Sequence, residues 1–298
     1  KLAHLYCIPS EVIVIFDGPA KPTIKRGTHI MKTPPWLTEP FKHFAQTLGF
    51  AVHDAAGEAE AELAALSCSG VIDAVITEDS DALVFGASHV FRSCSDNIII
   101  YSADNIQQHG EVMLSNGGLL LMALLCGGDY HAVGGEWHVD WHNMVLVTDL
   151  LQEAQAHSLT SNHEGLKDYI CGWSCHLQEI LVKDPLGHIG WHHPRFLNNV
   201  PDNFPDVSVV LAYVKPPTSA QPVSHDFIHS KVLDLENLAY LCEFHFCWSK
   251  YTLPGPVRDA ESMGTMWKLQ DYIWPGICIH VLLEVSWPVR IYCHTTPF

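Results

Sequence analysis

The stretch GEAEAELAALSCSGVIDAVITEDSDALVFG, residues 57–86, decides how this chain folds. Its first half, between Gly57 and Gly70, is rich in alanine and leucine and therefore favours a helix. The run VIDAVIT (71–77) is apolar and rich in β-branched residues, as strands are, and the acidic EDSD follows it as a loop. A helix followed by a strand that ends in a polar loop is typical of a domain with a parallel sheet.

The same stretch is dense in carboxylates and has no basic residue near it. Seven acids lie within 24 positions, namely Glu58, Glu60, Glu62, Asp73, Glu78, Asp79 and Asp81. From His43 to Phe91 the sequence contains no Lys or Arg. Because crowded charges of one sign repel and shift one another's pKa, this cluster needs a positive partner that its neighbourhood does not supply.

Strand and helix signals alternate on both sides of this stretch. EVIVIFDG (11–18) predicts a strand closed by an Asp-Gly turn, and PPWLTEPFKHFAQTLGF (34–50) predicts a helix capped by Thr38 that ends near Gly49. The other elements expected in this part are two hairpin strands at 89–93 and 97–102 and a helix at 111–130. The alternation indicates an α/β core with a parallel sheet.

The pattern weakens after about residue 131 and reads as mostly helical. Helices are expected at 150–180, at roughly 205–214, at 231–248 and at 262–284, with a Pro/Ser/Thr-rich connection at 214–224. The longest apolar run, within 118–128, is too short to span a bilayer, so no membrane partner is expected.

Composition limits the class of protein. The chain has 298 residues, 48% hydrophobic and 16% charged, which indicates a globular fold with a substantial core. Its ten cysteines show no extracellular scaffold pattern and are expected to be reduced. A net charge of −17 argues against gripping nucleic acid by charge alone, although each bound divalent ion would add two positive charges. Because the sequence opens on Lys1 rather than Met, we expect the true N-terminus to lie further upstream.

Acidic residues follow several apolar elements, at the places where ligands collect in open parallel sheets. Two of these places are the ends of the expected strands, one is the end of the helix near 117–126, and one is a helix N-terminus. The candidate metal ligands are Asp17, Glu58, Glu60, Asp79, Asp81 and Asp129. Six converging carboxylates favour Mg²⁺ or Mn²⁺, and two such ions roughly 3.5–4 Å apart would clamp a phosphodiester for in-line attack.

Other candidate groups have simpler explanations. The acids of the opening stretch expected to be structural are Glu62, Asp73 and Glu78. His138 and His142 are four apart and suit zinc, but they lack a third ligand, which favours packed or surface histidines. Cys171 and Cys175 do not form a paired CxxC and are expected to be half-buried on a helix.

Taken together, these motifs resemble the flap endonuclease/XPG family of structure-specific nucleases. IFDGPAKPTIKRG, GEAEAELA, ITEDSDALVFGA and LLCGGDY are similar to its successive signatures over roughly residues 11–130, and DLENLAYLCEFHFCW (234–248) resembles a later segment. The short span between FDG and GEAEA is similar to the Holliday-junction resolvase branch. The resemblance implies a PIN-like nuclease core at 1–130 and a divergent, mostly helical region at 131–298.

The resemblance also implies roles for individual residues. Asp17, Glu58 and Glu60 would bind one Mg²⁺ ion, and Asp79, Asp81 and Asp129 a second, with Mn²⁺ as a substitute. Lys25, helped by Arg26, would contact the scissile phosphate. The residues expected to bind DNA are Lys21, Lys25, Arg26 and Lys32. The implied partner is branched DNA and the implied location is the nucleus.

Two departures from the family pattern leave two hypotheses open. The family's N-terminal segment, which carries a further metal-site Asp, is not in this sequence. The stretch after GGDY, residues 131–151, lacks the family's Gly-x-Gly pattern and has no Lys or Arg. One hypothesis is a Mg²⁺-dependent endonuclease acting on 5′ flaps or four-way junctions. The alternative is a catalytically inactive member that acts as a binding or scaffold protein.

Overall fold

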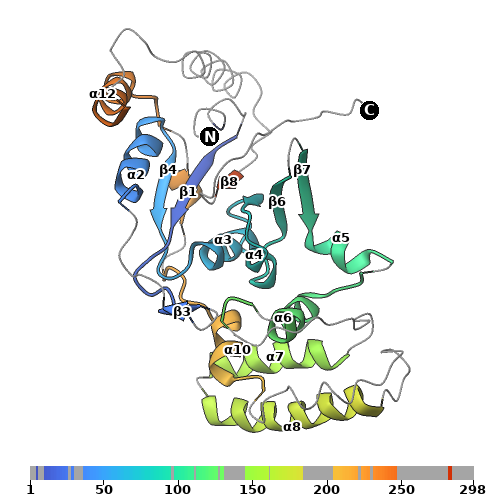
Figure 1. The fold of residues 1–298 in the computed structure, drawn as a ribbon. Helices are drawn as coiled ribbons and strands as arrows, with labels where there is room; N and C mark the ends of the chain where they lie inside the picture. The colour runs from blue at the N-terminus through green and yellow to red at the C-terminus, as the bar shows by residue number, and fades with distance from the viewer. Residues whose placement is uncertain are drawn as a thin grey trace.

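The fold is that of a computed structural model, in which most of the chain up to residue 246 is placed (Figure 1). The described residues are 5, 10–25, 28–29, 36–94, 97–110, 112–126, 128–130, 145–160, 162–183, 204–220, 223–228, 231–246 and 281–283. The predicted segments at 131–144 and 184–203 and most of 247–298 lie outside them.

A six-stranded mixed sheet forms the centre of the fold, in the order β4-β1-β8-β5-β6-β7. The strands are β1 (Val12–Phe16), β4 (Ala51–Asp54), β5 (Ala74–Ile76), β6 (His89–Cys94), β7 (Asn97–Ser102) and β8 (Val281–Leu283). All neighbouring pairs are parallel except the β6–β7 hairpin, which is antiparallel. This arrangement confirms the predicted α/β fold with a parallel core.

Strand β1 is buried on both faces, with helices packed on either side of it. Its side chains alternate between the two faces of the sheet, as strand geometry requires. Ile13 and Ile15 pack in the cluster that contains α3 (Ala59–Cys68), whereas Val12 and Val14 pack on the side of α2 (Thr38–Thr47). A strand buried on both faces reads as a continuous apolar run, as VIVIF does.

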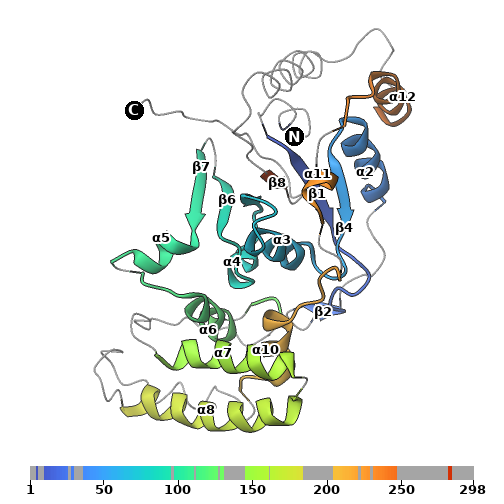
Figure 2. The ribbon, with the colours of Figure 1, turned by 180° about the vertical axis from the view of Figure 1, so that it is seen from behind.

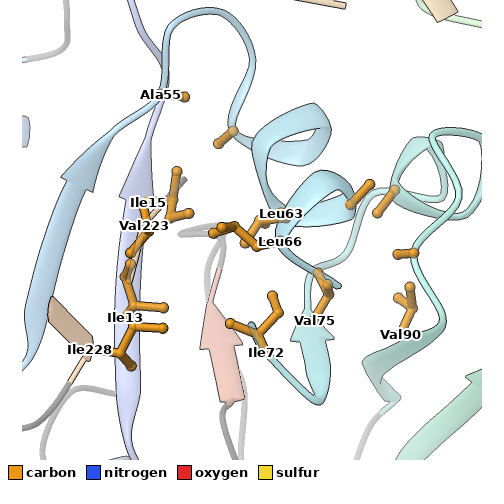
Figure 3. Packing of buried hydrophobic residues seen from close by; sticks show 14 of the residues in the cluster. Ile13, Ile15, Ala55, Leu63, Leu66, Ile72, Val75, Val90, Val223 and Ile228 are labelled. Carbon is orange, nitrogen blue, oxygen red and sulfur yellow. The ribbon is translucent and has the colours of Figure 1, made fainter. Parts of the chain in front are cut away.

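Helices cover both faces of the sheet. Figure 3 shows Leu63 and Leu66 of α3 lying against Ile13 and Ile15 of β1. On the other face α2 packs with α12 (Leu235–Phe246), and Figure 2 shows these two helices side by side.

A second cluster of buried apolar residues joins four helices into a layer beside the sheet (Figure 1). These helices are α6 (Asn116–Cys126), α7 (Val145–Leu159), α8 (His163–Lys183) and α10 (Val207–Val214). Leu121 of α6, Leu166 of α8 and Val210 of α10 are fully buried in this cluster. The predicted helix at 150–180 is therefore two helices, which are separated at Thr160–Asn162.

Three predicted element boundaries differ from the structure. Thr38 is the first residue of α2 rather than its cap, because Leu37 holds the N-cap position and makes no side-chain hydrogen bond. The helix expected from 111 begins only at Asn116. The helix expected at 262–284 lies outside the described residues except for β8, which is a strand.

Several short elements complete the described structure. They are the antiparallel pair β2 (Ile24–Lys25) and β3 (Thr28–His29), and the helices α4 (Asp81–Val84), α5 (Ala103–Gln108) and α11 (His225–Ile228). None of the helices within the described residues has both the length and the hydropathy needed to cross a membrane. Strand β8, from residues 281–283, also belongs to the six-stranded sheet. A domain boundary at residue 130 remains a prediction.

Candidate metal centre

The acidic loops follow elements of the core, as their sequence positions predicted. Asp17 directly follows β1, and Asp79 lies between β5 and α4, which begins at Asp81. Asp129 follows α6 after a short turn. The loops after β1 and β5 leave the sheet at the same edge, because both strands run parallel to β8.

The N-terminus of α3 brings two further acids to this region. Glu58 is the N-cap residue and Glu60 lies in the first turn, and both side chains are buried. The backbone N–H of Ala59 donates a hydrogen bond of 3.0 Å to Asp17 Oδ1. Asp17 therefore satisfies one of the donors at the start of the helix, where the helix dipole also favours negative charge.

Lys25 links two of the acids. Its ammonium group donates to Asp129 Oδ2 at 2.7 Å and forms an ion pair with Glu58 Oε1. Burial alone would lower the pKa of Lys25, but the hydrogen bonds to Asp129 and Glu58 outweigh burial and raise it. The ammonium is therefore firmly charged, and it brings Glu58 of α3 and Asp129 of the α6 loop to one point.

The pKa of Asp81 is raised by burial and by the negative charges close to it. Only 9% of this residue is exposed, and burial is the largest cause of its altered pKa. The nearby charges of Asp79, Asp129 and Glu58 add to burial, and together they raise the pKa of Asp81 to about 7 despite the opposing effect of Lys25. The Lys25 ammonium group thus offsets only part of the negative charge around Asp81.

Asp79 shapes the loop between β5 and α4. Its Oδ1 accepts a hydrogen bond of 2.9 Å from the backbone N–H of Asp81, while its own N–H donates to Thr77 Oγ1 at 3.0 Å. These local bonds are typical of acidic turn residues. They hold the carboxylates of Asp79 and Asp81 in a fixed loop at the end of the strand.

An aromatic cluster that was not predicted lies beside the acids. The hydroxyl of Tyr130 donates to Glu58 Oε2, and its ring packs edge-on against Tyr213 of α10 with centroids 4.7 Å apart. Phe85 contacts both rings. A Cβ atom at Gly128 would lie 1.9 Å from the Tyr213 hydroxyl, so only glycine fits there. The position of Tyr130 directly after Asp129 was a usable signal, whereas nothing in the sequence indicated Tyr213.

The predicted DNA-binding residues are only partly described. Lys21 Nζ lies 3.6 Å from Asp17 Oδ2, so this lysine sits beside the acids together with Lys25. Arg26 and Lys32 lie outside the described residues. The histidine pair His138 and His142 does too.

Glu62 lies one turn beyond Glu58 on α3 and has other partners. Its carboxylate accepts a hydrogen bond of 2.8 Å from the backbone N–H of Ser219 and lies 3.4 Å from His53 Nε2. Burial would raise the pKa of Glu62, but the hydrogen bonds from His53 and Ser219 outweigh burial and lower it. Glu62 thus anchors residues 215–219, here called the strap, to α3.

The cysteines of α8 differ from the prediction. Cys171 and Cys175 are exposed rather than half-buried, because the buried face of α8 is formed by Leu166, Ile170 and Trp173. Their spacing places them on the opposite, solvent side of the helix.

The acids suit a hard divalent cation, although they now enclose an ammonium group. Within the described parts of the chain, no three His, Cys, Asp or Glu side chains are arranged to hold a metal ion. Glu58 and Asp129, however, already share the Lys25 cation between two carboxylates. Oxygen donors of this kind are those that Mg²⁺ and Mn²⁺ prefer. The donor chemistry therefore fits a divalent ion at the place where the ammonium lies.

Comparison with known proteins supports the same region. The model of the XPG I-region matches residues 49–129, the segment that contains five of the six candidate ligands. Flap endonuclease GEN-like 1 of Arabidopsis thaliana is 34% identical over 120 residues, which cover 38% of this chain and 20% of the relative. Flap endonuclease 1 of Zea mays is 30% identical over 135 residues, covering 43% of this chain and 35% of the relative. The chain thus spans only about a third or less of the length of these relatives.

Solved structures agree over a longer part of the chain. A eukaryotic junction-resolving enzyme GEN-1 bound to potassium superposes with a TM-score of 0.66 and 25% identity, covering 88% of this chain and 62% of that one. The family-model match, the named relatives and this fold together support a nuclease of the flap endonuclease/XPG type, with the XPG I-region at residues 49–129. The catalytic core of Rad2, at 21% identity and a TM-score of 0.59, shares the fold and covers 87% of this chain and 81% of that one.

Proposed function

We propose that this chain is a member of the flap endonuclease/XPG family and a divalent-metal-dependent, structure-specific endonuclease. Its substrate would be branched DNA, a 5′ flap or a four-way junction, and its location the nucleus. The observation that carries the proposal is the convergence of carboxylates: Glu58 and Asp129 share the Lys25 ammonium, and the charges of Asp79, Asp129 and Glu58 help raise the pKa of the nearby Asp81. Relatives named flap endonuclease, and a junction-resolving enzyme solved with product DNA and Mg²⁺, support the choice of substrate.

The chain's own residues would share the work as follows. Asp17, Glu58 and Glu60 would hold one ion, and Asp79, Asp81 and Asp129 would hold a second, both within the proposed nuclease core at 1–130. When bound, two Mg²⁺ or Mn²⁺ ions supply activation of water and neutralisation of the phosphate charge. Lys25 and Arg26 would bind the scissile phosphate and stabilise the charge that develops on it. Lys21 and Lys32 would contact the adjacent DNA backbone.

A second candidate function, a binding or scaffold protein that does not cut, is favoured by two observations. The chain carries a net charge of −17, and the lysine proposed to bind phosphate is engaged by two carboxylates. A family member that had kept its fold but lost activity would bind junctions without any dependence on metal.

The test is a cleavage assay with end-labelled 5′-flap and four-way-junction DNA in Mg²⁺, in Mn²⁺ or in EDTA. We expect metal-dependent product from the wild type, and a loss of about 100-fold or more in the Asp79→Asn/Asp81→Asn variant. The matched control is Asp104→Asn/Asp168→Asn, which removes two exposed carboxylates of α5 and α8 and should cleave normally. Equal product from wild type and Asp79→Asn/Asp81→Asn would contradict the proposal. Metal-independent binding without product would favour the scaffold.

A further inference from the structure

The ion pairs of Lys25 join side chains that are mostly buried. The Lys25 side chain is 27% exposed, while those of its partners Glu58 and Asp129 are 5% and 14% exposed. The partners come from separate elements, 33 and 104 positions away in the chain. Ion pairs at exposed sites contribute little, but a pair between buried groups has a strong effect on the state of each partner.

The carboxylate oxygens that bind the Lys25 ammonium are also proposed to bind a metal ion. Glu58 Oε1 and Asp129 Oδ2 face the ammonium, whereas the proposed metal ligands require free carboxylate oxygens. Among the described residues, no three His, Cys, Asp or Glu side chains are grouped so as to hold a metal ion. An ammonium and a divalent ion carry charges of the same sign and compete for the same oxygens, so each weakens the binding of the other. We therefore expect metal binding to move Lys25.

The local backbone is compatible with such a change. Lys25 lies on the two-residue strand β2, which pairs only with β3 and stands apart from the six-stranded sheet. Its long, unbranched side chain can turn without any movement of the acids, because Glu58 and Asp129 are positioned by α3 and α6. Tyr130 continues to hold Glu58 through its other oxygen, Oε2.

We propose that Lys25 is the resident cation of the metal-free centre, and that a divalent ion binds by displacing its ammonium group from Glu58 and Asp129. The displaced ammonium remains beside the centre on β2, where it becomes available to a DNA phosphate. Metal loading and substrate contact are thereby coupled through one side chain. This inference rests on the proposed metal centre but does not require that the protein cleaves DNA.

The direction in which Lys25→Met changes the affinity for Mn²⁺ tests the inference. Mn²⁺ affinity is measured without DNA, by titration calorimetry, for the wild type and for Lys25→Met, which keeps the length of the side chain and removes its charge. If Lys25 competes with the metal, the variant binds Mn²⁺ about tenfold more tightly, or about 1.4 kcal/mol. If Lys25 instead organises the ligands, the variant binds more weakly.

Lys42→Met is the matched control. Lys42 also pairs with two carboxylates, Asp54 at 2.6 Å and Glu39 at 3.1 Å, but these lie on β4 and α2. This control should keep the Mn²⁺ affinity of the wild type. Its melting temperature should fall equally in EDTA and in Mn²⁺, whereas that of Lys25→Met should fall in EDTA and recover with Mn²⁺.

Three results would overturn the inference. They are unchanged or weaker Mn²⁺ binding by Lys25→Met, failure of this variant to fold even with Mn²⁺, and absence of Mn²⁺ binding by the wild type. Lys25→Arg keeps the positive charge and should stay within about threefold of the wild-type affinity, so tighter binding by this variant would also contradict competition. Because no DNA is present, a protein that passes these tests and yet fails to cleave would refute only the nuclease.

Discussion

At the scale of single residues, the carboxylates of the centre repel one another, and the effect is visible in the pKa of Asp81. Asp81 is buried among Asp79, Asp129 and Glu58, and its pKa is raised to about 7. The folded-state pKa thus lies above the ordinary value of 3.8 that applies in the unfolded chain. The folded state therefore binds more protons between these two values. The stability that this group contributes is present at low pH and is lost as the pH rises through 7.

Asp81→Asn should therefore stabilise the metal-free protein, because asparagine resembles the neutral carboxyl. In EDTA we expect a gain in the free energy of unfolding that is about 2 kcal/mol larger at pH 8 than at pH 5. Urea unfolding at the two pH values measures it, with Asp104→Asn as an exposed control that should change little. A gain that is the same at both pH values would show that the carboxyl of Asp81 does not titrate in this range.

At the scale of elements, the strap at 215–219 links the helical layer to the start of α3. Lys215 Nζ donates to the carbonyl oxygen of Ser158 at the end of α7, and the N–H of Ser219 donates to Glu62 on α3. Between them, Pro217 lies against Gly57, the residue that precedes the N-cap of α3. The strap thus holds the helix terminus on which two proposed metal ligands depend.

Gly57→Ala should separate the strap from α3. The added Cβ would lie 2.7 Å from the carbonyl oxygen of Pro217, which is backbone and cannot turn away. We expect a loss of about 1–3 kcal/mol in the free energy of unfolding. Gly172→Ala adds the same methyl group on the exposed face of α8, where no atom lies within 4 Å, and should gain about 0.5–1 kcal/mol. Equal effects of the two variants in urea unfolding would contradict the contact.

At the scale of the whole molecule, charge decides how the protein meets DNA. A net charge of −17 repels the phosphate backbone, and the described basic residues near the acids are Lys21 and Lys25, both engaged by carboxylates. Each divalent ion bound at the centre would neutralise two of these negative charges. It would also release the Lys25 ammonium from Glu58 and Asp129. Affinity for DNA should therefore depend on metal loading as well as on salt.

Ca²⁺ offers a test without cleavage, because it is a hard cation that accepts the same oxygen ligands. We expect the wild type to bind a labelled four-way junction about tenfold more tightly in Ca²⁺ than in EDTA at equal ionic strength, as measured by fluorescence anisotropy. Asp79→Asn/Asp81→Asn should lose most of this difference. An equal gain in that variant would place the effect of Ca²⁺ elsewhere on the protein.

Elements encoded in a short continuous segment could be predicted from the sequence, whereas elements that depend on pairing between distant segments could not. The apolar run of β1 and the helix of GEAEA, with the carboxylates beside them, lie in short continuous segments, so both elements were predicted. Strand β4 is only four residues long, Ala51–Asp54, and was missed. Strand β8 was expected to be helical, because its pairing with β1 and β5 joins positions more than 200 residues apart.

The same distinction applies to the site. The acids could be found because each lies at an end of a recognisable strand or helix: Asp17 and Asp79 follow strands, Asp81 begins α4, Asp129 follows α6, and Glu58 and Glu60 begin α3. The contacts of Lys25 with Asp129 and of Tyr213 with Gly128 join segments that are distant in the sequence, and no local pattern encodes them. The positive partner that the acidic stretch requires was therefore found only in the structure, in a lysine 33 positions before Glu58.

We infer that this carboxylate cluster binds a divalent metal ion and that the Lys25 ammonium occupies the position of that ion before it binds. A crystal structure of the protein soaked in MnCl₂, with anomalous scattering used to locate manganese, decides between these states. We expect an anomalous peak among Glu58, Asp129 and the EDSD loop, with Lys25 turned away from both partners. A structure without manganese at the cluster, and with both ion pairs of Lys25 intact, would contradict it.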